Sequence, residues 1–311
     1  MTRTAWVVGA SGLLGSAITR RLKTDDQWAE VVTDPLPWAE PDAAVREITR
    51  LAEHVRESPR PVTLFWCAGA SVVGATPDRL AGELDLLTRL LDGVAKVFAR
   101  SPGHPLDVFF ASSAGGVYAG SADPPFTERT PPVPISPYGA AKLESEALVR
   151  RFADETGAHV LVGRISNLYG PGQRLEKAQG VISQICRSFF TGHPTSIYVP
   201  LDTIRDYLYV DDAAALITAA MLLDRTDHVT VKIFGSLQPV TLGEILAQMR
   251  AVFKRRPPVM LGHSPNSSSQ ARDLRFRSVV LPEIDRLPRR SLPSGIHATA
   301  MGMTSAAAPR S

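Results

Sequence analysis

The chain of 311 residues is 44% hydrophobic and 21% charged, which is ordinary for a globular protein with a large core. Its net charge of +3 comes without a long run of basic residues, so the composition does not indicate a nucleic-acid-binding surface. No apolar run has the length of a membrane span, and the N-terminus enters a strand without a signal peptide, so we expect no membrane partner. Cys67 and Cys186 form neither a disulfide framework nor a metal-ligand spacing, so we expect a cytoplasmic protein without a metal site.

A glycine-rich turn joins the first predicted strand to the first predicted helix. Residues 4–8 are typical of a short buried strand, and Leu14, Ile18 and Leu22 then recur at helical spacing. Glycines in the turn allow a tight bend, close approach of a pyrophosphate and close helix–strand packing, while amides at the helix start face the anion. The alternative is a turn that serves packing alone. We predict dinucleotide binding by Gly9, Ser11, Gly12, Leu13, Leu14 and Gly15.

An acidic residue follows the second predicted strand, which ends at Val31-Val32-Thr33. Asp34 stands nineteen residues after Gly15, close to the position of a carboxylate that binds the adenosine ribose hydroxyls. A carboxylate there repels a ribose phosphate, so we expect NAD rather than NADP. The alternative is a turn aspartate before Pro35. The stretch from Pro35 to Asp42 leaves little room for a third strand.

Strands and helices then alternate along the chain. The periodicity predicts a helix at 42–57, a strand at 62–67, a helix at 80–98 and a strand at 106–111. Such alternation is typical of an α/β protein with a Rossmann-type, doubly wound parallel sheet. Ligands of these sheets bind at the carboxyl ends of the strands.

Small and polar residues stand at two of these strand ends. The small residues Ala68, Gly69 and Ala70 allow a cofactor to lie against the sheet. Ser112 and Ser113 are placed to hydrogen-bond a substrate oxygen, although two serines can also simply open a turn.

Tyr138 and Lys142 form the candidate catalytic pair. They follow a loop at 119–137, rich in Pro, Gly, Asp and Thr, that we expect to cover the site. Four residues apart on a helix, they share one face. A free tyrosine has a pKa of about 10, and a neighbouring ammonium favours the phenolate. The pair can therefore act as a general acid and base, although the same spacing also occurs on half-exposed helix faces.

The second half of the chain is less regular. We expect strands at 160–165, 196–199, 205–210 and 229–234, and helices at 178–192, 212–223 and 241–254. We expect a Rossmann domain at 1–170, to which part of 200–235 returns, a smaller C-terminal α/β substrate-binding region at 171–297, and a disordered tail at 298–311.

These motifs, in this order, resemble those of extended short-chain dehydrogenases/reductases of the NAD-dependent epimerase/dehydratase family, typified by sugar-nucleotide epimerases. The resemblance covers about residues 4 to 290. It rests on the glycine turn, the Ala-Gly-Ala of 68–70, Ser112-Ser113, Ser136-Pro137-Tyr138-x-x-x-Lys142, Arg164-x-x-Asn167-x-Tyr169-Gly170-Pro171-Gly172 and Arg205-Asp206-Tyr207-x-Tyr209-Val210-x-Asp212.

The resemblance implies roles for residues at matching positions. Tyr138 is the acid/base, and Lys142 holds the nicotinamide ribose, so both also contact the cofactor. Ser113 hydrogen-bonds the reacting oxygen, with Ser112 as its competitor.

Further positions are implied to bind the substrate. Asn167 contacts the phosphate region of a sugar nucleotide, and Arg205 faces its phosphate or base. Arg272, or Arg275, does likewise from the C-terminal segment.

The chain also departs from the family pattern in two places. Members that dehydrate sugars carry an Asp-Glu pair after the catalytic hydroxyl residue, whereas Ser113 is followed by Ala114-Gly115-Gly116, which disfavours a dehydratase. The short 35–42 stretch removes part of the usual wall beside the adenine.

We therefore expect an NAD-dependent epimerase that acts on a nucleotide sugar and forms a homodimer through the helices at 80–98 and 138–155. The alternatives are an NAD(P)H-dependent 4-ketoreductase and, outside enzymes, a catalytically silent dinucleotide-binding sensor. The latter predicts a broken Tyr–Lys pair, and both residues are present.

Overall fold

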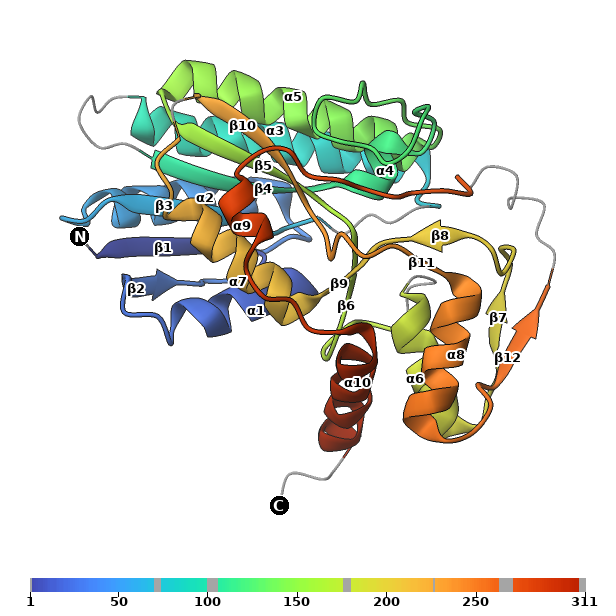
Figure 1. Ribbon diagram of the computed structural model, residues 1–311. Helices are drawn as coiled ribbons and strands as arrows, with labels where there is room; N and C mark the ends of the chain where they lie inside the picture. The colour runs from blue at the N-terminus through green and yellow to red at the C-terminus, as the bar shows by residue number, and fades with distance from the viewer. Residues whose placement is uncertain are drawn as a thin grey trace.

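A six-stranded parallel sheet forms the centre of the molecule in the computed structural model, which describes residues 2–69, 74–99, 106–175, 180–225, 227–262 and 271–307 (Figure 1). Its strands stand in the order β10-β5-β4-β3-β1-β2, and every neighbouring pair is parallel. They are β1 (Arg3–Val8), β2 (Trp28–Val32), β3 (Val62–Trp66), β4 (Leu106–Ser113), β5 (His159–Ile165) and β10 (Val229–Phe234). The predicted α/β Rossmann-type fold is confirmed.

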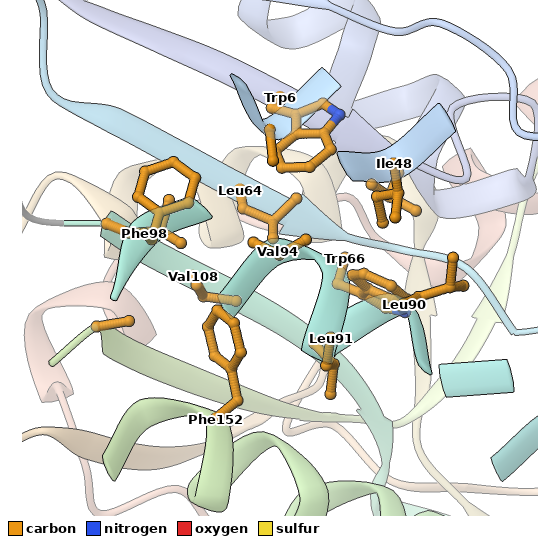
Figure 2. Packing of buried hydrophobic residues seen from close by; sticks show 14 of the residues in the cluster. Trp6, Ile48, Leu64, Trp66, Leu90, Leu91, Val94, Phe98, Val108 and Phe152 are labelled. Atoms are coloured by element: carbon orange, nitrogen blue, oxygen red, sulfur yellow. The ribbon is translucent and has the colours of Figure 1, made fainter. Parts of the chain in front are cut away.

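Three helices cover one face of the sheet: α2 (Pro41–Arg56), α3 (Pro77–Phe98) and α5 (Pro137–Thr156). Figure 2 shows the strand residues Trp6, Leu64 and Val108 in contact with side chains of these helices, among them Val94 and Phe152. Because successive strand residues point to opposite faces, a sheet covered on both sides needs continuously apolar strands. All five residues of β3 are accordingly buried.

The opposite face carries α1 (Leu13–Leu22) and α7 (Val210–Met221), which lie below the sheet in Figure 1. Ala5, Val7 and Phe65 point to this side and pack with Ile18 and Ile217. Helices on both faces make the sheet doubly wound, as predicted from the alternation.

The sheet ends at β2. Residues 33–40 contain no strand, and α2 begins at Pro41, so the expectation that a third strand has no room here is confirmed. This edge matters for the cofactor site described below.

A smaller region lies beside the carboxyl ends of the strands and has a core of its own (Figure 1). Its helices are α6 (Val181–Thr191), α8 (Leu242–Phe253) and α10 (Leu292–Ala307). Three short strand pairs accompany them: β6 (Asn167–Tyr169) with β9 (Tyr207–Tyr209), β8 (Ile204–Arg205) with β11 (Val240–Thr241), and β7 (Thr195–Ile197) with β12 (Val259–Leu261).

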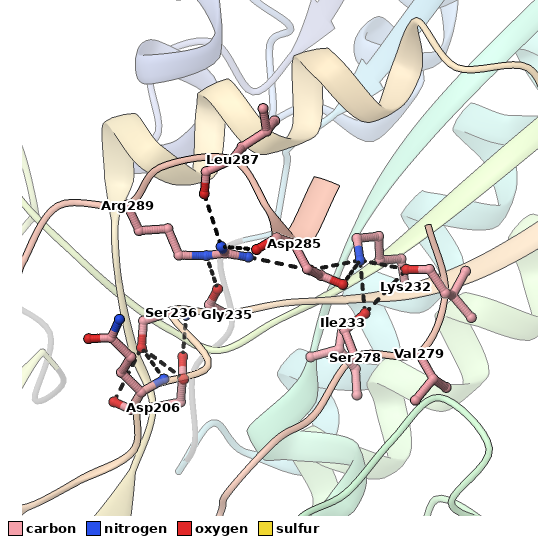
Figure 3. A network of polar contacts seen from close by, with 12 residues as sticks. Asp206, Lys232, Ile233, Gly235, Ser236, Ser278, Val279, Asp285, Leu287 and Arg289 are labelled. Atoms are coloured by element: carbon pink, nitrogen blue, oxygen red, sulfur yellow. Dashed lines mark hydrogen bonds and ion pairs between the residues drawn. The ribbon is translucent and has the colours of Figure 1, made fainter. Parts of the chain in front are cut away.

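The strand predicted at 205–210 is interrupted. Asp206 separates β8 from β9, because its carboxylate accepts hydrogen bonds from the backbone N–H of Ser236 at 2.8 Å and from the Ser236 hydroxyl at 2.9 Å (Figure 3). Asp206 is completely buried, so these bonds satisfy a carboxylate that has no access to water. The strand prediction was therefore wrong at this residue.

The predicted disorder of the tail is also wrong for residues 298–307, which belong to α10. Ile296, Thr299 and Ala300 are buried against α6 and α8. Small residues give this helix little apolar periodicity, so its stability comes from tertiary packing that local sequence does not reveal.

A buried polar network attaches the C-terminal segment to β10 (Figure 3). The ammonium of Lys232 has no exposed surface and donates to Asp285 at 3.0 Å, to the Ser278 hydroxyl at 2.8 Å and to the Val280 carbonyl at 2.7 Å. Burial lowers the pKa of Lys232, although the Asp285 carboxylate opposes this. Glu128 accepts from Ser278 at 2.6 Å and thereby joins the loop before α5 to the same network.

Short helices complete the fold: α4 (Ala114–Tyr118) after β4 and α9 (Pro282–Asp285) in the C-terminal segment. Among the described residues, a helix with both the length and the apolar character to cross a membrane is not found.

Candidate functional site

The glycine turn after β1 is in tight contact with the end of β3. Gly9 has a φ of +86°, and a Cβ there would lie 2.7 Å from the backbone nitrogen of Ala68. A Cβ on Gly15 would lie 2.2 Å from the Gly9 carbonyl oxygen, which already accepts from the Gly12 N–H at 3.0 Å. Only glycine fits at these two positions, and the compact turn leaves the amides at the start of α1 in place for an anion.

The other predicted cofactor residues lie near this turn. Ser11 is exposed, whereas Leu14 is buried in the core under α1. Asp34 is exposed, two residues beyond the pair Trp6–Val32 that aligns β2 with β1. Parallel strands lie about 4.8 Å apart, so this register holds Asp34 beside the end of β1.

The end of β3 connects the turn to Lys142. A Cβ on Gly69 would lie 3.4 Å from the Lys142 ammonium nitrogen. Ala68 contacts the glycine turn, as described above, so Ala68 and Gly69 bridge the two parts of the site. Ala70 lies outside the described residues.

Tyr138 and Lys142 lie in the first turns of α5. The Ser136 hydroxyl caps this helix and accepts from the Gly139 N–H at 3.1 Å. Both side chains of the pair are half-buried, and the Lys142 nitrogen lies 5.8 Å from the centroid of the Tyr138 ring. The predicted sharing of one helix face is thus confirmed.

Ser113 lies close to Tyr138. A Cβ on Gly116 would be 3.1 Å from Tyr138 Cε1 and 3.2 Å from Ser113 Oγ, so this glycine contacts both side chains. The Ser113 hydroxyl also caps α4 by accepting from the Gly116 N–H at 3.1 Å. Because a hydroxyl can accept and donate at the same time, Ser113 can still donate to an oxygen placed beside Tyr138.

Ser112 points to the other side of β4, as the alternation of strand residues requires. Its hydroxyl donates to Glu146 at 2.6 Å, and the residue is 6% exposed. The structure therefore places Ser112 in the interior, contrary to its prediction as a substrate contact, whereas the role predicted for Ser113 stays a prediction.

Sequence reasoning missed the partner of Ser112. Glu146 stands eight residues after Tyr138 on α5, and its carboxylate binds Arg164 of β5 through two hydrogen bonds, at 3.1 and 2.7 Å. Arg164 also donates to the Tyr118 hydroxyl at 2.6 Å. The sequence signal for this network was Glu146 itself, an acidic residue about two helical turns after Tyr138 on the same predicted helix.

This network is nearly closed to solvent, because the side chains of Arg164 and Glu146 are only 8% and 7% exposed. Burial opposes the charge of Arg164, but its bonds to Glu146 and Tyr118 prevail and raise its pKa above the ordinary value. The ion pair fixes α5, and with it Tyr138, to the central sheet.

Asn167 begins β6 and Arg205 ends β8, and both strands belong to small sheets separate from the main one. The Asn167 side chain is exposed at its outer part and donates to the Asp206 carbonyl at 3.1 Å. Burial lowers the pKa of Arg205, with Tyr207 and Asp273 opposing, and its guanidinium donates to a neighbouring carbonyl at 2.8 Å.

Arg272 and Arg275 lie in the segment beside β8. Arg272 is on the surface, with a side chain 72% exposed and paired with Asp202. Arg275 pairs with Asp273 at 2.7 Å. Both guanidinium groups have carboxylate partners of their own, so a contact of either with substrate stays a prediction.

These residues fit a dinucleotide, because the glycine cradle would be filled by any Cβ and leads through Ala68 and Gly69 to Lys142. Residues 5–231 also match the model of the NAD dependent epimerase/dehydratase family. The chain belongs to this family. The predicted resemblance is confirmed, and so is NAD as the family's cofactor.

Curated relatives carry out several reactions. The chain is 33% identical to the dTDP-4-dehydro-6-deoxyglucose reductase of Escherichia coli over 156 residues. This aligned segment covers 50% of this chain and 48% of the reductase. It is 28% identical to the dTDP-glucose 4,6-dehydratase of Haemophilus influenzae over 232 residues, and this match covers 66% of this chain and 67% of the dehydratase. It is 25% identical over 311 residues to the UDP-glucose 4-epimerase of Azospirillum brasilense, covering 90% and 88%. The chain thus spans about half the length of the reductase.

Solved structures share the fold. The UDP-glucose 4-epimerase of Thermotoga maritima, solved with UDP-glucose, superposes with a TM-score of 0.81 at 20% identity, covering 98% of this chain and all of that one. MoeE5, solved with UDP-glucuronic acid and NAD, superposes with a TM-score of 0.78 at 21% identity, covering 97% and 99%. The named relatives are enzymes of nucleotide sugars.

Proposed function

We propose that this protein is an NAD-dependent epimerase of a nucleotide sugar, with Tyr138 as its acid/base. The observation that carries the proposal is the position of the Tyr138–Lys142 pair. Tyr138 contacts Gly116 beside Ser113, and Lys142 contacts Gly69, which leads to the glycine turn. Proton-transfer groups and the predicted cofactor residues therefore converge at one edge of the sheet.

Each residue has a defined task in this reaction. In its phenolate form Tyr138 takes the proton from a sugar hydroxyl, and the phenol so formed later returns that proton, while Ser113 hydrogen-bonds the same sugar oxygen. The positive charge of Lys142 stabilises negative charge that develops on the Tyr138 oxygen. NAD, when bound, supplies the nicotinamide that takes up and returns a hydride.

Arg205 and Asn167 are our candidates for the diphosphate of the substrate. Within the described ranges, the partly buried guanidinium of Arg205 forms no ion pair, unlike those of Arg272 and Arg275. A partly buried cation with donors to spare is suited to phosphate oxygens.

The segment after Ser113 argues against dehydration. Expulsion of water from a sugar needs a carboxylic acid beside the departing hydroxyl. Ala114, Gly115 and Gly116 occupy the start of α4 instead and bring no titratable group. We therefore set this protein apart from its dehydratase relatives.

A 4-ketoreductase is the second candidate, because the Escherichia coli reductase is 33% identical over half of this chain. The same residues serve both reactions, since each moves one hydride and one proton. The two differ in stoichiometry: an epimerase returns its hydride, whereas a reductase consumes one NADH or NADPH per turnover.

The test begins with extraction and identification of any bound nucleotide. The protein is then incubated with UDP- and dTDP-sugars, and products are resolved by NMR. An inverted carbon without net change in NADH supports the epimerase, and stoichiometric NADH or NADPH use supports the reductase. Tyr138→Phe should abolish turnover and keep NAD binding; normal turnover in this variant would refute the assigned role.

We also propose that the protein is cytoplasmic and forms a homodimer through α3 and α5. The support is that these helices pack side by side on one face of the sheet, as Figure 1 shows. Light scattering of the purified protein tests the dimer.

A further inference from the structure

Trp38 differs from the other tryptophans of the chain. Trp6, Trp28 and Trp66 are 1%, 6% and 3% exposed and belong to the core, two of them visible in Figure 2. Trp38 is 42% exposed. Tryptophan is enriched at interfaces because its ring offers a large, rigid apolar surface, and the place of Trp38 in the fold indicates which ligand it can meet.

Trp38 lies in the loop that follows Asp34. Leu36 is buried at 6% exposure and anchors the loop to the core. The backbone N–H of Trp38 donates to the Leu36 carbonyl at 2.9 Å, and the backbone N–H of Glu40 donates to the Pro37 carbonyl at 2.9 Å. These two turns keep Trp38 within a few residues' reach of Asp34, at the carboxyl end of the sheet.

Among the described residues, no further strand stands outside this side of the sheet to form a wall there. β2 is the last strand, and among the described residues nothing pairs with its outer side. If the pyrophosphate lies at the start of α1 and the ribose at Asp34, the adenine reaches the loop 35–40. Trp38 is the large apolar side chain that this loop leaves exposed.

We propose that Trp38 stacks on the adenine of the bound NAD and replaces the missing wall. This inference rests on NAD binding at the glycine turn. Stacking of a base on an aromatic ring tolerates variation in geometry and is worth enough to weaken binding roughly 5- to 100-fold when the ring is removed.

Binding measurements on the full-length protein, freed of nucleotide, test this proposal. Calorimetry with NAD, ADP-ribose and nicotinamide mononucleotide is performed on wild type, Trp38→Ala and Trp38→Phe. We expect Trp38→Ala to weaken NAD and ADP-ribose roughly 5- to 100-fold and to leave the mononucleotide unchanged. Trp38→Phe should retain most of the affinity, because it keeps an aromatic face.

Tyr198→Ala is the matched control, since Tyr198 is 50% exposed in the smaller region. It should bind all three ligands as wild type does. Far-UV circular dichroism verifies that each variant is folded.

Fluorescence gives a second readout that does not depend on activity. Stacking by ADP-ribose should quench the emission of the exposed indole, and the quenching should vanish in Trp38→Phe. Wild-type affinity in Trp38→Ala, or equal quenching in Trp38→Phe, would overturn the proposal while NAD binding itself stands. Failure of the wild type to bind NAD would overturn the proposed function as well.

Discussion

The ion pair between Glu146 and Arg164 offers the most direct test of how the catalytic helix is held. Glu146→Gln keeps the size of the side chain and removes its charge. Arg164 then remains buried at 8% exposure without a carboxylate, and the Ser112 hydroxyl loses its charged acceptor. We expect the variant to lose stability and α5 to loosen on the sheet.

The expected loss follows from burial. Both side chains are more than nine-tenths buried, and three hydrogen bonds end on the Glu146 carboxylate. Removal of one partner of such a pair costs about 3 to 5 kcal/mol, because the other charge is left uncompensated in a medium of low polarity. Glu47→Gln is the control: it breaks an Arg50–Glu47 pair whose arginine side chain is 58% exposed, and it should cost far less stability than Glu146→Gln.

Urea unfolding followed by circular dichroism near neutral pH measures both losses. The double variant Glu146→Gln/Arg164→Met removes both charges and should recover part of the stability lost in Glu146→Gln alone. If Glu146→Gln costs no more than Glu47→Gln, or if the double variant is simply additive, the buried pair does not hold α5 as argued.

The further predictions concern the glycine turn, the cap of α8 and the network around Lys232 on β10. Gly15→Ala would place a Cβ 2.2 Å from the Gly9 carbonyl oxygen, so we expect NAD affinity, measured by calorimetry, to fall at least about tenfold through distortion of the turn. Thr241→Ala removes the capping box of α8 and should cost about 1 kcal/mol in urea unfolding. The backbone N–H and the hydroxyl of Thr241 donate to the Glu244 carboxylate and lower the pKa of Glu244 from its ordinary value of 4.5. The Glu244 carboxylate therefore stabilises the fold fully above pH 4.5, and this contribution is lost as the pH falls through the lowered pKa. The stability advantage of wild type over Glu244→Gln should disappear over the same pH range. Lys232→Met leaves Asp285 without its main partner and should cost about 3 kcal/mol, with faster proteolysis of the C-terminal segment.

Contrary results would refute this reasoning. Unchanged stability in Thr241→Ala would mean that the capping box does not stabilise α8. Wild-type NAD affinity in Gly15→Ala would mean that the turn adapts and does not cradle the cofactor. If the difference in unfolding free energy between wild type and Glu244→Gln stays constant from pH 6 to about pH 3, the charge of Glu244 does not stabilise the cap of α8. A Lys232→Met variant as stable as wild type would show that packing alone holds the segment to β10.

The sequence by itself predicts the features that depend on neighbouring residues. Gly9 and Gly15 bracket a turn in which side chains do not fit, and the spacing of Tyr138 and Lys142 places both on one helix face whatever surrounds them. The alternation of apolar strands and amphipathic helices likewise predicts the doubly wound sheet, because periodicity is a property of neighbouring residues.

Tertiary contacts determine the orientation of the two serines and the structure of the C-terminal helix. Ser112 and Ser113 are equivalent in sequence, but Glu146 draws Ser112 into the interior and leaves Ser113 beside Tyr138. Residues 298–307 lack apolar periodicity but belong to α10, whose Ile296 and Ala300 are buried against α6 and α8. What a strand or helix faces depends on segments far away in the chain, so a pattern within one segment cannot reveal it.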